Sequence, residues 1–521
     1  MPSFPHALTL SSALAGAVTH SLVHRRPDSS WCGTPDPRVL DTAVTAIALA
    51  ACADEAGRAA VARARSWLRH ADPQTHHPLA YELEAALRAL ALGQEVRHTA
   101  ASTDIVLSGR TRLLTVLAGH SLPGAGCPRT ALRAELDRGL RERLKPWTVV
   151  ELLAGIAILA MRAGDLGEAR AAVARLRPHQ WPDGSFYGNP VCTALALLAL
   201  ALTGSEPDLL DRTRRRVLRT QQEDGTWRFC ASEVWDTALM VRAGQGLPRF
   251  DRHALPGALA FLAAAQNPDG GWSYTRGLES DNDTTGAVLL ALGGRSLPGR
   301  GLPRALAYLA GQQTADGLWR TWQYRQDPPA QDVVAHVLGG LHQYRGQHHI
   351  PLAPATRWLG ECWQREGRWS SSWYRGLPYA TAEVGAALAG QEVLDHAVKA
   401  LLANQNGDGG WGAEAGLASS AAATGLALLA LSRSRVLDPD SREAAVTWLL
   451  RTRPADGTWA GEPDMYGPRP MLVHYPTQTH AFVLLGLRAA LVHRTSDVWC
   501  SDYRNGPAAG VPGSLLSRFS T

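Results

Sequence analysis

Cysteine is scarce in this sequence, and the few residues of this type stand apart from one another. Among 521 residues there are seven, an odd number, and no Cys-x-x-Cys pair occurs. A disulfide framework or a cysteine-rich zinc site would need paired cysteines at short, regular spacings, so neither is indicated. Isolated thiols suit a reducing compartment, and we expect a cytoplasmic protein.

Long apolar runs are also missing. No stretch of about 18 apolar residues occurs, which predicts that the chain has no transmembrane helix. Residues 1–18 lack a basic start, and Pro5 and His6 interrupt their apolar character. We therefore expect this segment to form a helix of the fold and not a signal peptide.

Neither sign of charge forms a long block. The formal net charge is +5, and basic runs are as short as residues 214–216, which we interpret as a solvated helix face. Nucleic acid is therefore not an expected partner. The sequence also has no phosphate-binding P-loop and no dinucleotide fingerprint, so nucleotide chemistry of those types is not indicated.

A turn that ends in an aromatic residue is repeated along the chain. Most copies contain Asp-Gly, and their final aromatics lie roughly 40–50 residues apart, a spacing typical of helical repeats. The copies are residues 180–186, 221–227, 266–272, 313–319, 364–369, 405–411 and 453–459. Each lies between stretches rich in Ala and Leu, so the repeating unit is predicted to be helix, turn, helix.

The residues of the turn have separate structural tasks. Gly supplies unusual backbone angles and Asp can accept bonds from local amides. We expect the Gln to bond backbone groups of a neighbouring unit, and the Trp to clamp adjacent repeats by burying a large apolar surface. A ring of paired helices, an α/α toroid, would close such repeats without exposed ends. The length of the chain predicts two or three domains.

Residues 279–286 carry two carboxylates one residue apart, Asp281 and Asp283, directly before the apolar run 287–292. An Asp in that place is commonly a helix N-cap, and either Asp or either of the following threonines could take that part. The alternative is that Asp283 is an acid that protonates a carbon–carbon double bond. This segment by itself leaves both interpretations open.

Several segments together resemble one family. The repeated turns look like the QW motifs of triterpene and class II diterpene cyclases, of which squalene–hopene cyclase is a familiar member. Other segments resemble the family in the same order, namely residues 41–43, 78–87, 183–186 and 234–237. The resemblance covers nearly the whole chain, from about Asp41 to Trp459. The turns are specific to the superfamily, whereas each of the other segments carries less weight.

This resemblance implies an all-α fold of two α/α toroid domains, called β and γ, with the reactive cavity between them. The β domain would comprise residues 1–25, its N-terminal helix, and residues 222–521. The γ domain, inserted between them, would comprise residues 26–221. No room remains for the class I domain of the larger plant enzymes. No Asp-Asp pair and hence no DDxxD motif occurs, so a diphosphate on the substrate should be retained.

Class II cyclases begin by protonating an alkene, a very weak base, so the acid must stay protonated in a dry cavity. The family motif is DxDD, with the second of its three Asp as the acid. Residues 281–285 read DxDTT, which gives that role to Asp283 and puts Thr284 in place of the third Asp. DxDTT resembles the form found in drimenyl diphosphate synthases. Burial and the like charge of Asp281 should raise a carboxyl pKa, whereas the helix N-terminus should lower it by favouring the anion. We expect burial and like charge to have the larger effect.

A second segment, residues 332–338, resembles the DVTAHVL segment of squalene–hopene cyclase, whose His hydrogen-bonds the catalytic Asp. Carried over, His336 would hold one oxygen of Asp283 and leave the proton on the other aimed at the alkene. A lone His on an apolar helix can also be a satisfied core residue, and the matching string favours the functional role.

The resemblance also implies residues that bind the substrate. Residues 372–381 resemble the family's Trp- and Tyr-bearing pocket segment, whose rings would face the cations, although core packing would explain these residues equally well. The aromatic candidates are Trp235, Trp322, Tyr324, Trp373 and Tyr379. The candidate cations for a diphosphate are Lys145, in a segment that loosely resembles a plant one although an ordinary surface Lys would also explain it, and Arg276 and Arg375, which are nearer the catalytic motifs in sequence. No base is identified; Tyr274, His336 or water could serve.

No metal ligand is carried over from the family. Plant relatives have an acidic motif in the stretch that corresponds to residues 70–77, where this chain has a single acidic residue, Asp72. We therefore expect Mg²⁺ to arrive with the diphosphate.

The sequence thus predicts a class II sesquiterpene cyclase that converts farnesyl diphosphate to a bicyclic drimane-type product, drimenyl diphosphate. One alternative is a class II diterpene cyclase that acts on geranylgeranyl diphosphate with the same acid and a deeper pocket. A distant alternative is a non-catalytic helical-repeat binding protein, which would need neither Asp283 nor His336 at a cavity. The ligand set of a zinc-dependent prenyltransferase is not found, and the oligomeric state is not predicted.

Overall fold

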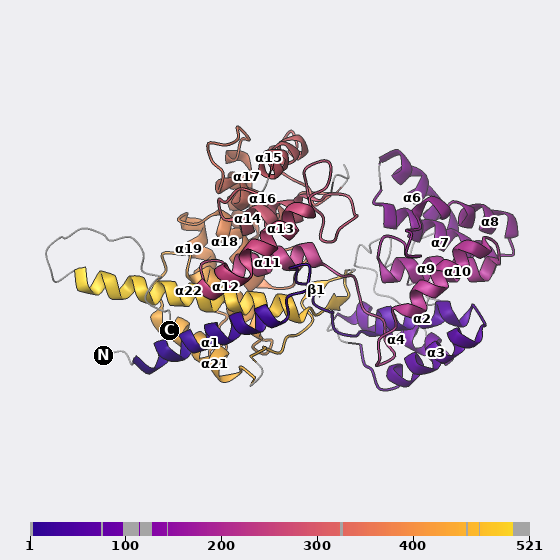
Figure 1. The fold of residues 1–521 in the computed structure, drawn as a ribbon, viewed down its shortest axis with the longest axis horizontal. Coiled ribbons are helices and arrows are strands. Elements are labelled where there is room, and N and C mark those ends of the chain that lie inside the picture. The colour runs from indigo at the N-terminus through magenta and orange to yellow at the C-terminus, as the bar shows by residue number, and fades with distance from the viewer. Residues whose placement is uncertain are drawn as a thin grey trace.

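The fold, taken from a computed structural model, is built almost entirely of helices (Figure 1). The structure describes residues 4–73, 77–96, 114, 128–142, 144–297, 299–322, 327–454, 457–467 and 469–503, and side chains are described for all of these except 4–9, 142 and 493–503. Within these ranges the strands are β1 (Met465–Tyr466) and β2 (Leu472–Val473), which pair antiparallel. The predicted all-α fold is confirmed.

The larger of two helical bodies, the β domain, has a closed inner ring. Its inner helices are α11 (Glu233–Gly244), α14 (Asn282–Leu292), α16 (Gln331–His342), α18 (Leu377–Ala387), α20 (Ala421–Leu431) and α22 (Pro476–Tyr503). Each of these helices contacts the next in this order, and α22 returns to contact α11. The ring therefore has no open end.

An outer layer of helices surrounds this ring. It consists of α1 (Phe4–Val23), α13 (Leu255–Ala264), α15 (Gly301–Gln312), α17 (Ala353–Glu366), α19 (Glu392–Leu402) and α21 (Pro439–Arg451), with the short α12 (Pro248–His253) before α13. The first helix of the chain, α1, runs beside the last, α22 (Figure 1). Inner helices such as α11 and α20 are buried along their whole length, whereas outer helices bury one face, as expected of two layers.

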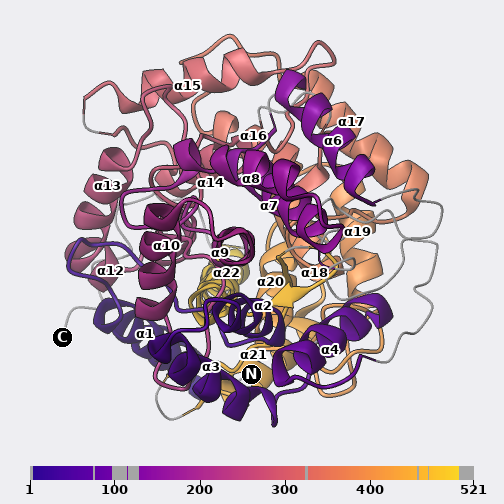
Figure 2. The same cartoon turned by 90° about the vertical axis from the view of Figure 1, so that its right-hand side faces the viewer.

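The smaller body, the γ domain, is a second arrangement of paired helices. Its described elements are α2 (Val39–Ala50), α3 (Glu55–Leu68), α4 (Pro78–Leu92), α6 (Pro128–Glu142), α7 (Pro146–Arg162), α8 (Leu166–Ala174), η1 (Arg177–His179), α9 (Pro190–Thr203) and α10 (Pro207–Arg219). Helix α2 contacts α4 and α9, and α9 contacts α7. Figure 2 looks onto this body, with the ring of the β domain behind it.

The repeated tryptophans tie each outer helix to the turn that follows it. The indole N–H of Trp272 donates to the carbonyl of Leu262 (2.7 Å), ten residues earlier on the outer helix. The same bond, always to the tenth residue back, is made by Trp31, Trp227, Trp319, Trp369, Trp411 and Trp459. Carbonyl groups near a helix C-terminus lack intrahelical partners, so each indole satisfies one of them.

The glutamine of the turn reaches the next repeat, as the sequence predicted. The side-chain amide of Gln266 donates to the carbonyl of Gly270 in its own turn and to that of Gly301, where α15 begins (both 2.8 Å). Gln313 and Gln405 make the corresponding pairs of bonds. The turns therefore join consecutive outer helices.

Each domain has its own hydrophobic core. Trp31 packs in the larger core, with α1 and α22, whereas Trp227 packs in the smaller one. The domain limits at residues 25/26 and 221/222 stay predictions. Among the helices that the structure describes, none combines the length and the apolar character needed to cross a bilayer.

Candidate active site

A cavity of about 800 Å³ lies between the two domains, at the N-terminal ends of the inner β-domain helices. Its volume is typical of sites for small molecules. Trp147, Thr148 and Glu151 of α7 supply part of the γ-domain wall. The wall is rich in aromatic residues, namely Trp147, Phe229, Trp235, Tyr274, Trp322, Trp358, Trp373, Tyr374, Tyr466 and Tyr475. The cavity lies where the resemblance places it.

Asp281 is the N-cap of α14. Its side chain accepts a hydrogen bond from the backbone N–H of Thr284 (2.6 Å) and another from the hydroxyl of the same residue (3.0 Å). Its own N–H donates to the carbonyl of Trp272 (2.8 Å), which ties the start of the helix to the Trp turn. The capping interpretation therefore holds for Asp281, and it leaves Asp283 unexplained.

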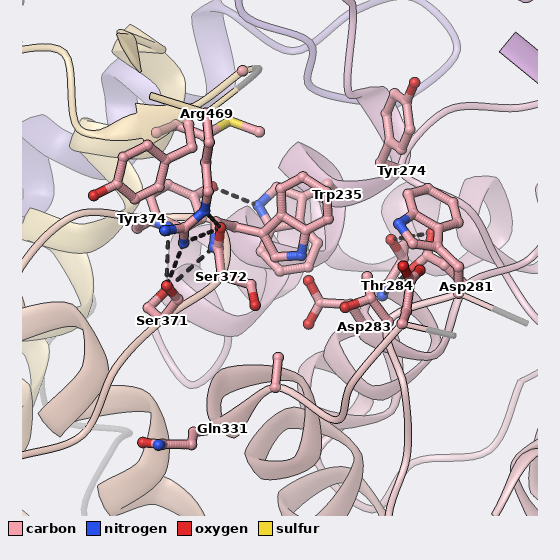
Figure 3. Close-up of a pocket in the computed structure, with 18 of the residues that line it drawn as sticks. Trp235, Tyr274, Asp281, Asp283, Thr284, Gln331, Ser371, Ser372, Tyr374 and Arg469 are labelled. Carbon is pink, nitrogen blue, oxygen red and sulfur yellow. Dashed lines mark hydrogen bonds between the residues drawn. The ribbon is translucent and has the colours of Figure 1, made fainter. Parts of the chain in front are cut away.

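Asp283 lies in the first turn of α14, buried at the cavity (Figure 3). Its Oδ1 is 2.6 Å from Nδ1 of His336 on α16. This is the contact that the resemblance implied. The other ring nitrogen of His336, Nε2, lies 3.1 Å from Oε2 of Glu383 on α18, and Glu383 accepts from Nη1 of Arg242 on α11 (2.7 Å).

The electrostatics of this cluster favour a protonated acid. Burial raises the pKa of Asp283, His336 acts to lower it, and neighbouring carboxylates raise it further. Burial and the like charge of Asp283 raise the pKa of Asp281 to about 8. Burial acts to lower the pKa of His336, but Asp283 and Glu383 raise it to about 10. Desolvation and like charge thus outweigh the helix N-terminus, the direction expected from the sequence.

Asp332 anchors the loop that carries part of the aromatic wall. Its buried Oδ2 accepts from the hydroxyl of Ser371 (2.8 Å) and from the N–H groups of Ser372 (2.9 Å) and Trp373 (3.3 Å). This residue opens the segment 332–338 that resembles the family, so a signal for it was present in the sequence. No comparable string marked Glu383 or Arg242, which reach His336 only through the fold.

The predicted aromatic residues fall into different places. Trp235 and Trp373 line the cavity, and the ring of Trp235 lies 5.7 Å from that of His336. The indole of Trp235 donates to the hydroxyl of Tyr374 (3.0 Å), a cavity residue that the sequence analysis did not single out. Tyr379 is not among the lining residues of this cavity and stacks on Tyr374 at 4.3 Å.

Trp322 joins the two domains at the cavity. Its ring meets Trp147 of α7 edge to face at 5.1 Å and Trp373 of the β domain at 6.4 Å. The remaining aromatic candidate, Tyr324, lies outside the described residues.

Among the predicted cations, Lys145 lies at the cavity. Its Nζ is 3.4 Å from Oδ2 of Asp327 and 4.6 Å from the ring centroid of Trp322. Arg276 is not among the lining residues; it is half exposed and pairs with Glu233 and Asp28. Arg276 therefore has no place on the cavity wall, and its contact with the substrate stays a prediction.

Arg375 is likewise not a lining residue of the cavity. Its backbone N–H donates to the carbonyl of Asp464 (2.7 Å), and the residue borders a small void on the far side of Tyr374. The loop turns at Gly376, where the positive φ of 105° sends the chain away from the cavity. An unpredicted cation, Arg469, does line the cavity and donates to the carbonyl of Ser372 (3.0 Å).

Asp283 and Arg469 lie at separate places on the cavity wall. In Figure 3, Asp281, Asp283 and Thr284 lie on one side of the close-up, and Arg469 with Ser371 lies on the other. The arrangement can hold an apolar chain against aromatic rings, present an acid at one place and offer cations elsewhere. Among the described residues, no group of three or more His, Cys, Asp or Glu side chains could hold a metal ion.

Two family models match the chain. The squalene–hopene cyclase C-terminal domain matches residues 321–491, and the prenyltransferase α/α toroid domain matches residues 134–322. Among solved structures, ent-copalyl diphosphate synthase from Streptomyces platensis is similar, with a TM-score of 0.58 and 19% identity over 94% of this chain and 99% of that one. At this identity the likeness concerns the fold.

Two relatives are each 28% identical to this chain. A drimenyl diphosphate synthase of Streptomyces showdoensis aligns over 415 residues, 74% of this chain but 66%, just under two thirds, of its own length. A drimenyl diphosphate synthase of Streptantibioticus cattleyicolor aligns over 465 residues, 82% of this chain and 84% of its own length. Both domains, the cavity between them and these relatives agree: the chain belongs to the class II terpene cyclases, the superfamily of squalene–hopene cyclase and the class II diterpene cyclases.

Proposed function

We propose that this class II cyclase acts on farnesyl diphosphate and forms a bicyclic drimane-type diphosphate, drimenyl diphosphate. Asp283 gives its proton to the terminal alkene, two rings close in sequence, and a proton leaves from the final cation. The diphosphate stays attached, so the reaction is an isomerisation. The departing proton balances the one that Asp283 supplied.

One observation carries the proposal: a buried carboxyl with a raised pKa opens onto an aromatic cavity and is bonded on one oxygen by His336. This bond leaves Oδ2 of Asp283 to carry the proton that is transferred. Trp235 and other rings of the wall would stabilise the cations through their π faces. Burial also excludes water, which would otherwise compete with the alkene for the proton.

The choice of the C15 substrate rests on sequence. Asp281, Asp283, Thr284 and Thr285 form the motif that resembles drimenyl diphosphate synthases, and two relatives of that name align over most of the chain. The alternative is geranylgeranyl diphosphate, which the fold shared with ent-copalyl diphosphate synthase keeps open. A cavity of about 800 Å³ does not by itself choose between the two chain lengths.

Lys145 and Arg469 are the proposed cations for the diphosphate end. Both line the cavity, and each already contacts an aromatic ring, Trp322 for Lys145 and Tyr466 for Arg469. Mg²⁺ is proposed to accompany the substrate, where it would neutralise diphosphate charge.

Two incubations test the proposal. The purified chain is supplied with Mg²⁺ and either farnesyl or geranylgeranyl diphosphate, and the products are analysed by mass spectrometry before and after phosphatase treatment. A bicyclic C15 alcohol that needs phosphatase to appear is the expected result. A C20 product would keep the mechanism and reject the shorter substrate, and folded protein without any cyclised product would reject the proposed function.

A further inference from the structure

His336 is held between two carboxyl groups, deep in the ring of inner helices. Its Nδ1 faces Oδ1 of Asp283 at 2.6 Å, and its Nε2 faces Oε2 of Glu383 at 3.1 Å. The side chains of His336 and Glu383 are 2% and 1% exposed. Behind them Nη1 of Arg242, 9% exposed, donates to the same oxygen of Glu383 at 2.7 Å. The chain Arg242–Glu383–His336–Asp283 thus spans α11, α18, α16 and α14.

The geometry constrains where protons can lie in this hydrogen-bonded series of side chains. A neutral imidazole has one N–H donor, whereas both ring nitrogens of His336 face oxygens of acidic groups. With Glu383 ionised, both contacts are hydrogen bonds when His336 is an imidazolium. Asp283 must at the same time carry its proton on Oδ2 to act as an acid, because a proton on Oδ1 would be bonded to His336 and not aimed at the alkene. The reactive state therefore needs two protons on the Asp283–His336 pair.

We propose that Glu383 is the counter-ion that lets the Asp283–His336 pair hold two protons at once, and that Arg242 keeps Glu383 ionised for this task. The inference rests on the proposed role of Asp283 as the acid. It assigns Glu383 and Arg242 as positioning residues, which act on the alkene through His336 and Asp283.

Glu383 supports both stages of the proton transfer. Before transfer, its negative charge favours protons on His336 and on Asp283, and it raises the pKa of both groups. During transfer, the imidazolium that it maintains donates to the carboxylate that forms on Asp283. A neutral His336 would provide a weaker donor at that moment.

Arg242 explains how a buried carboxylate can stay charged. An ionised carboxyl in the interior is costly unless it is paired and bonded. Burial acts to raise the pKa of Glu383, but Arg242 and His336 hold it well below its ordinary value. Without Arg242, Glu383 would take a proton itself and its charge would no longer support the pair.

Other charged and titratable groups surround the series Arg242–Glu383–His336–Asp283 and contribute to the pH dependence of its protonation. They are Asp281 on α14, Asp332 on α16, Tyr379 on α18, Tyr374 before α18, Arg433 after α20 and Arg488 on α22. The two arginines repel Arg242, and burial lowers the pKa of Arg433 to about 9. Of the charges that act on His336 itself, Asp283 and Glu383 are the ones that raise its pKa.

The first test replaces the charge of Glu383 and keeps its shape. In Glu383→Gln the pair should hold its second proton only at lower pH, so the alkaline limb of the kcat profile should move at least about one pH unit toward acid. KM should stay within about two-fold, because Glu383 does not reach the cavity. A kcat that falls equally at every pH, with the limb unmoved, would mean that Glu383 only orients His336 and would overturn the proposal.

Matched variants control for the loss of a buried charge. Glu383→Asp and Arg242→Lys keep the charges and should keep the limb near its wild-type position, whereas Arg242→Met should move it in the same direction as Glu383→Gln. Glu84→Gln removes another buried carboxyl, one in the γ-domain core, and should leave the profile in place. A shift in Glu84→Gln equal to that in Glu383→Gln would also count against the proposal.

A second measurement needs neither substrate nor a stable variant of Glu383. In the ¹⁵N-histidine-labelled wild-type chain, the signals of His336, assigned by their absence in His336→Asn, should be those of an imidazolium at pH 8. A neutral His336 at that pH would overturn the proposal even in an active enzyme. Charged His336 in a chain that cyclises no prenyl diphosphate would instead reject the proposed function and leave the charge assignment standing.

Discussion

Two pairs of inner helices in the β domain, α14 with α16 and α20 with α22, share a scaffold and differ in chemistry. Each pair begins after a Trp turn. The backbone N–H of the Trp donates to a Thr hydroxyl thirteen residues later, from Trp272 to Thr285 and from Trp411 to Thr424 (both 3.0 Å). The turn Asn bonds the same loop positions in both copies. The two helix starts can therefore be superposed residue by residue.

Both pairs also cross at a glycine. A Cβ on Gly286 would lie 2.6 Å from the backbone N of Val337, and a Cβ on Gly425 would lie 2.6 Å from the carbonyl O of Phe482. Such distances are too short for any side chain, so the close crossing requires Gly at both places. Through this crossing, His336 of one pair corresponds to Phe482 of the other.

The difference lies at two facing positions. The N-caps correspond, Asp281 in α14 and Ser420 in α20, and each accepts from the N–H three residues on. Asp283 corresponds to Ala422. The α20–α22 pair thus forms the same scaffold with Ala422 and Phe482 at the positions where the α14–α16 pair has Asp283 and His336. Capping explains the first carboxyl of the motif and not the second, which is the proposed acid.

The largest effect should follow from making α14 like α20 at its acid. Asp283→Ala puts the residue of α20 at this position, so α14 should form and the far-UV circular dichroism should be unchanged. Activity should fall by about 10³-fold or more, because no other group replaces the general acid. Full activity in this variant would show that Asp283 is not the acid.

The reverse change should cost stability. Ala422 is 2% exposed, so Ala422→Asp puts a carboxyl in the interior. The residue that corresponds to His336 there is Phe482, which cannot pair with the new charge. The free energy of unfolding should fall by about 3 kcal/mol, read as a lower thermal midpoint. Ala422→Asn, equal in size but uncharged, should lose less. Equal midpoints for the two variants would refute the charge argument.

A smaller effect is expected when Asp281 takes the residue of its counterpart. Asp281→Ser keeps an oxygen for the cap, whereas Asp281→Ala should lose about 1 kcal/mol of stability. The Ser variant should be about 10-fold less active above about pH 8, where Asp281 of the wild type is ionised and its like charge helps to keep Asp283 protonated. Its activity should recover as the pH falls. A Ser variant with wild-type activity at all pH values would limit Asp281 to capping.

The smallest effect is expected from Lys145 in the γ domain, which lies across the cavity from the start of α14. Asp281, Asp283 and Thr284 border the cavity, whereas the start of α20 does not. Lys145 belongs to the opposing γ-domain wall. Lys145→Ala should raise KM for the diphosphate substrate about 10-fold with little change in kcat. Arg276→Ala, away from the cavity, is its matched control and should leave KM unchanged. Equal KM values for wild type and Lys145→Ala would remove Lys145 from the diphosphate site.

The local signals in the sequence were strong where one short segment makes its own structure. The Trp turns and Asp281 as a possible cap were indicated by strings of a few residues, and the pairing of Asp283 with His336 was implied by the family resemblance of residues 332–338. The sequence could not place Arg276, because nearness in sequence to the motif says nothing about which side of a loop a long side chain takes. Its partners Asp28 and Glu233 come from segments far apart in the chain.

By itself the sequence determined the helical repeat and, through its resemblance to a family, indicated the two-toroid fold and Asp283 as the predicted acid, since each depends on period, turn chemistry or a contiguous motif. Only the tertiary structure decided which charges stand behind that acid. Arg242, His336 and Glu383 are separated by 94 and 47 positions along the chain, and no periodicity relates them. They meet because a closed ring brings α11, α16 and α18 around one centre, where burial makes each charge depend on the next.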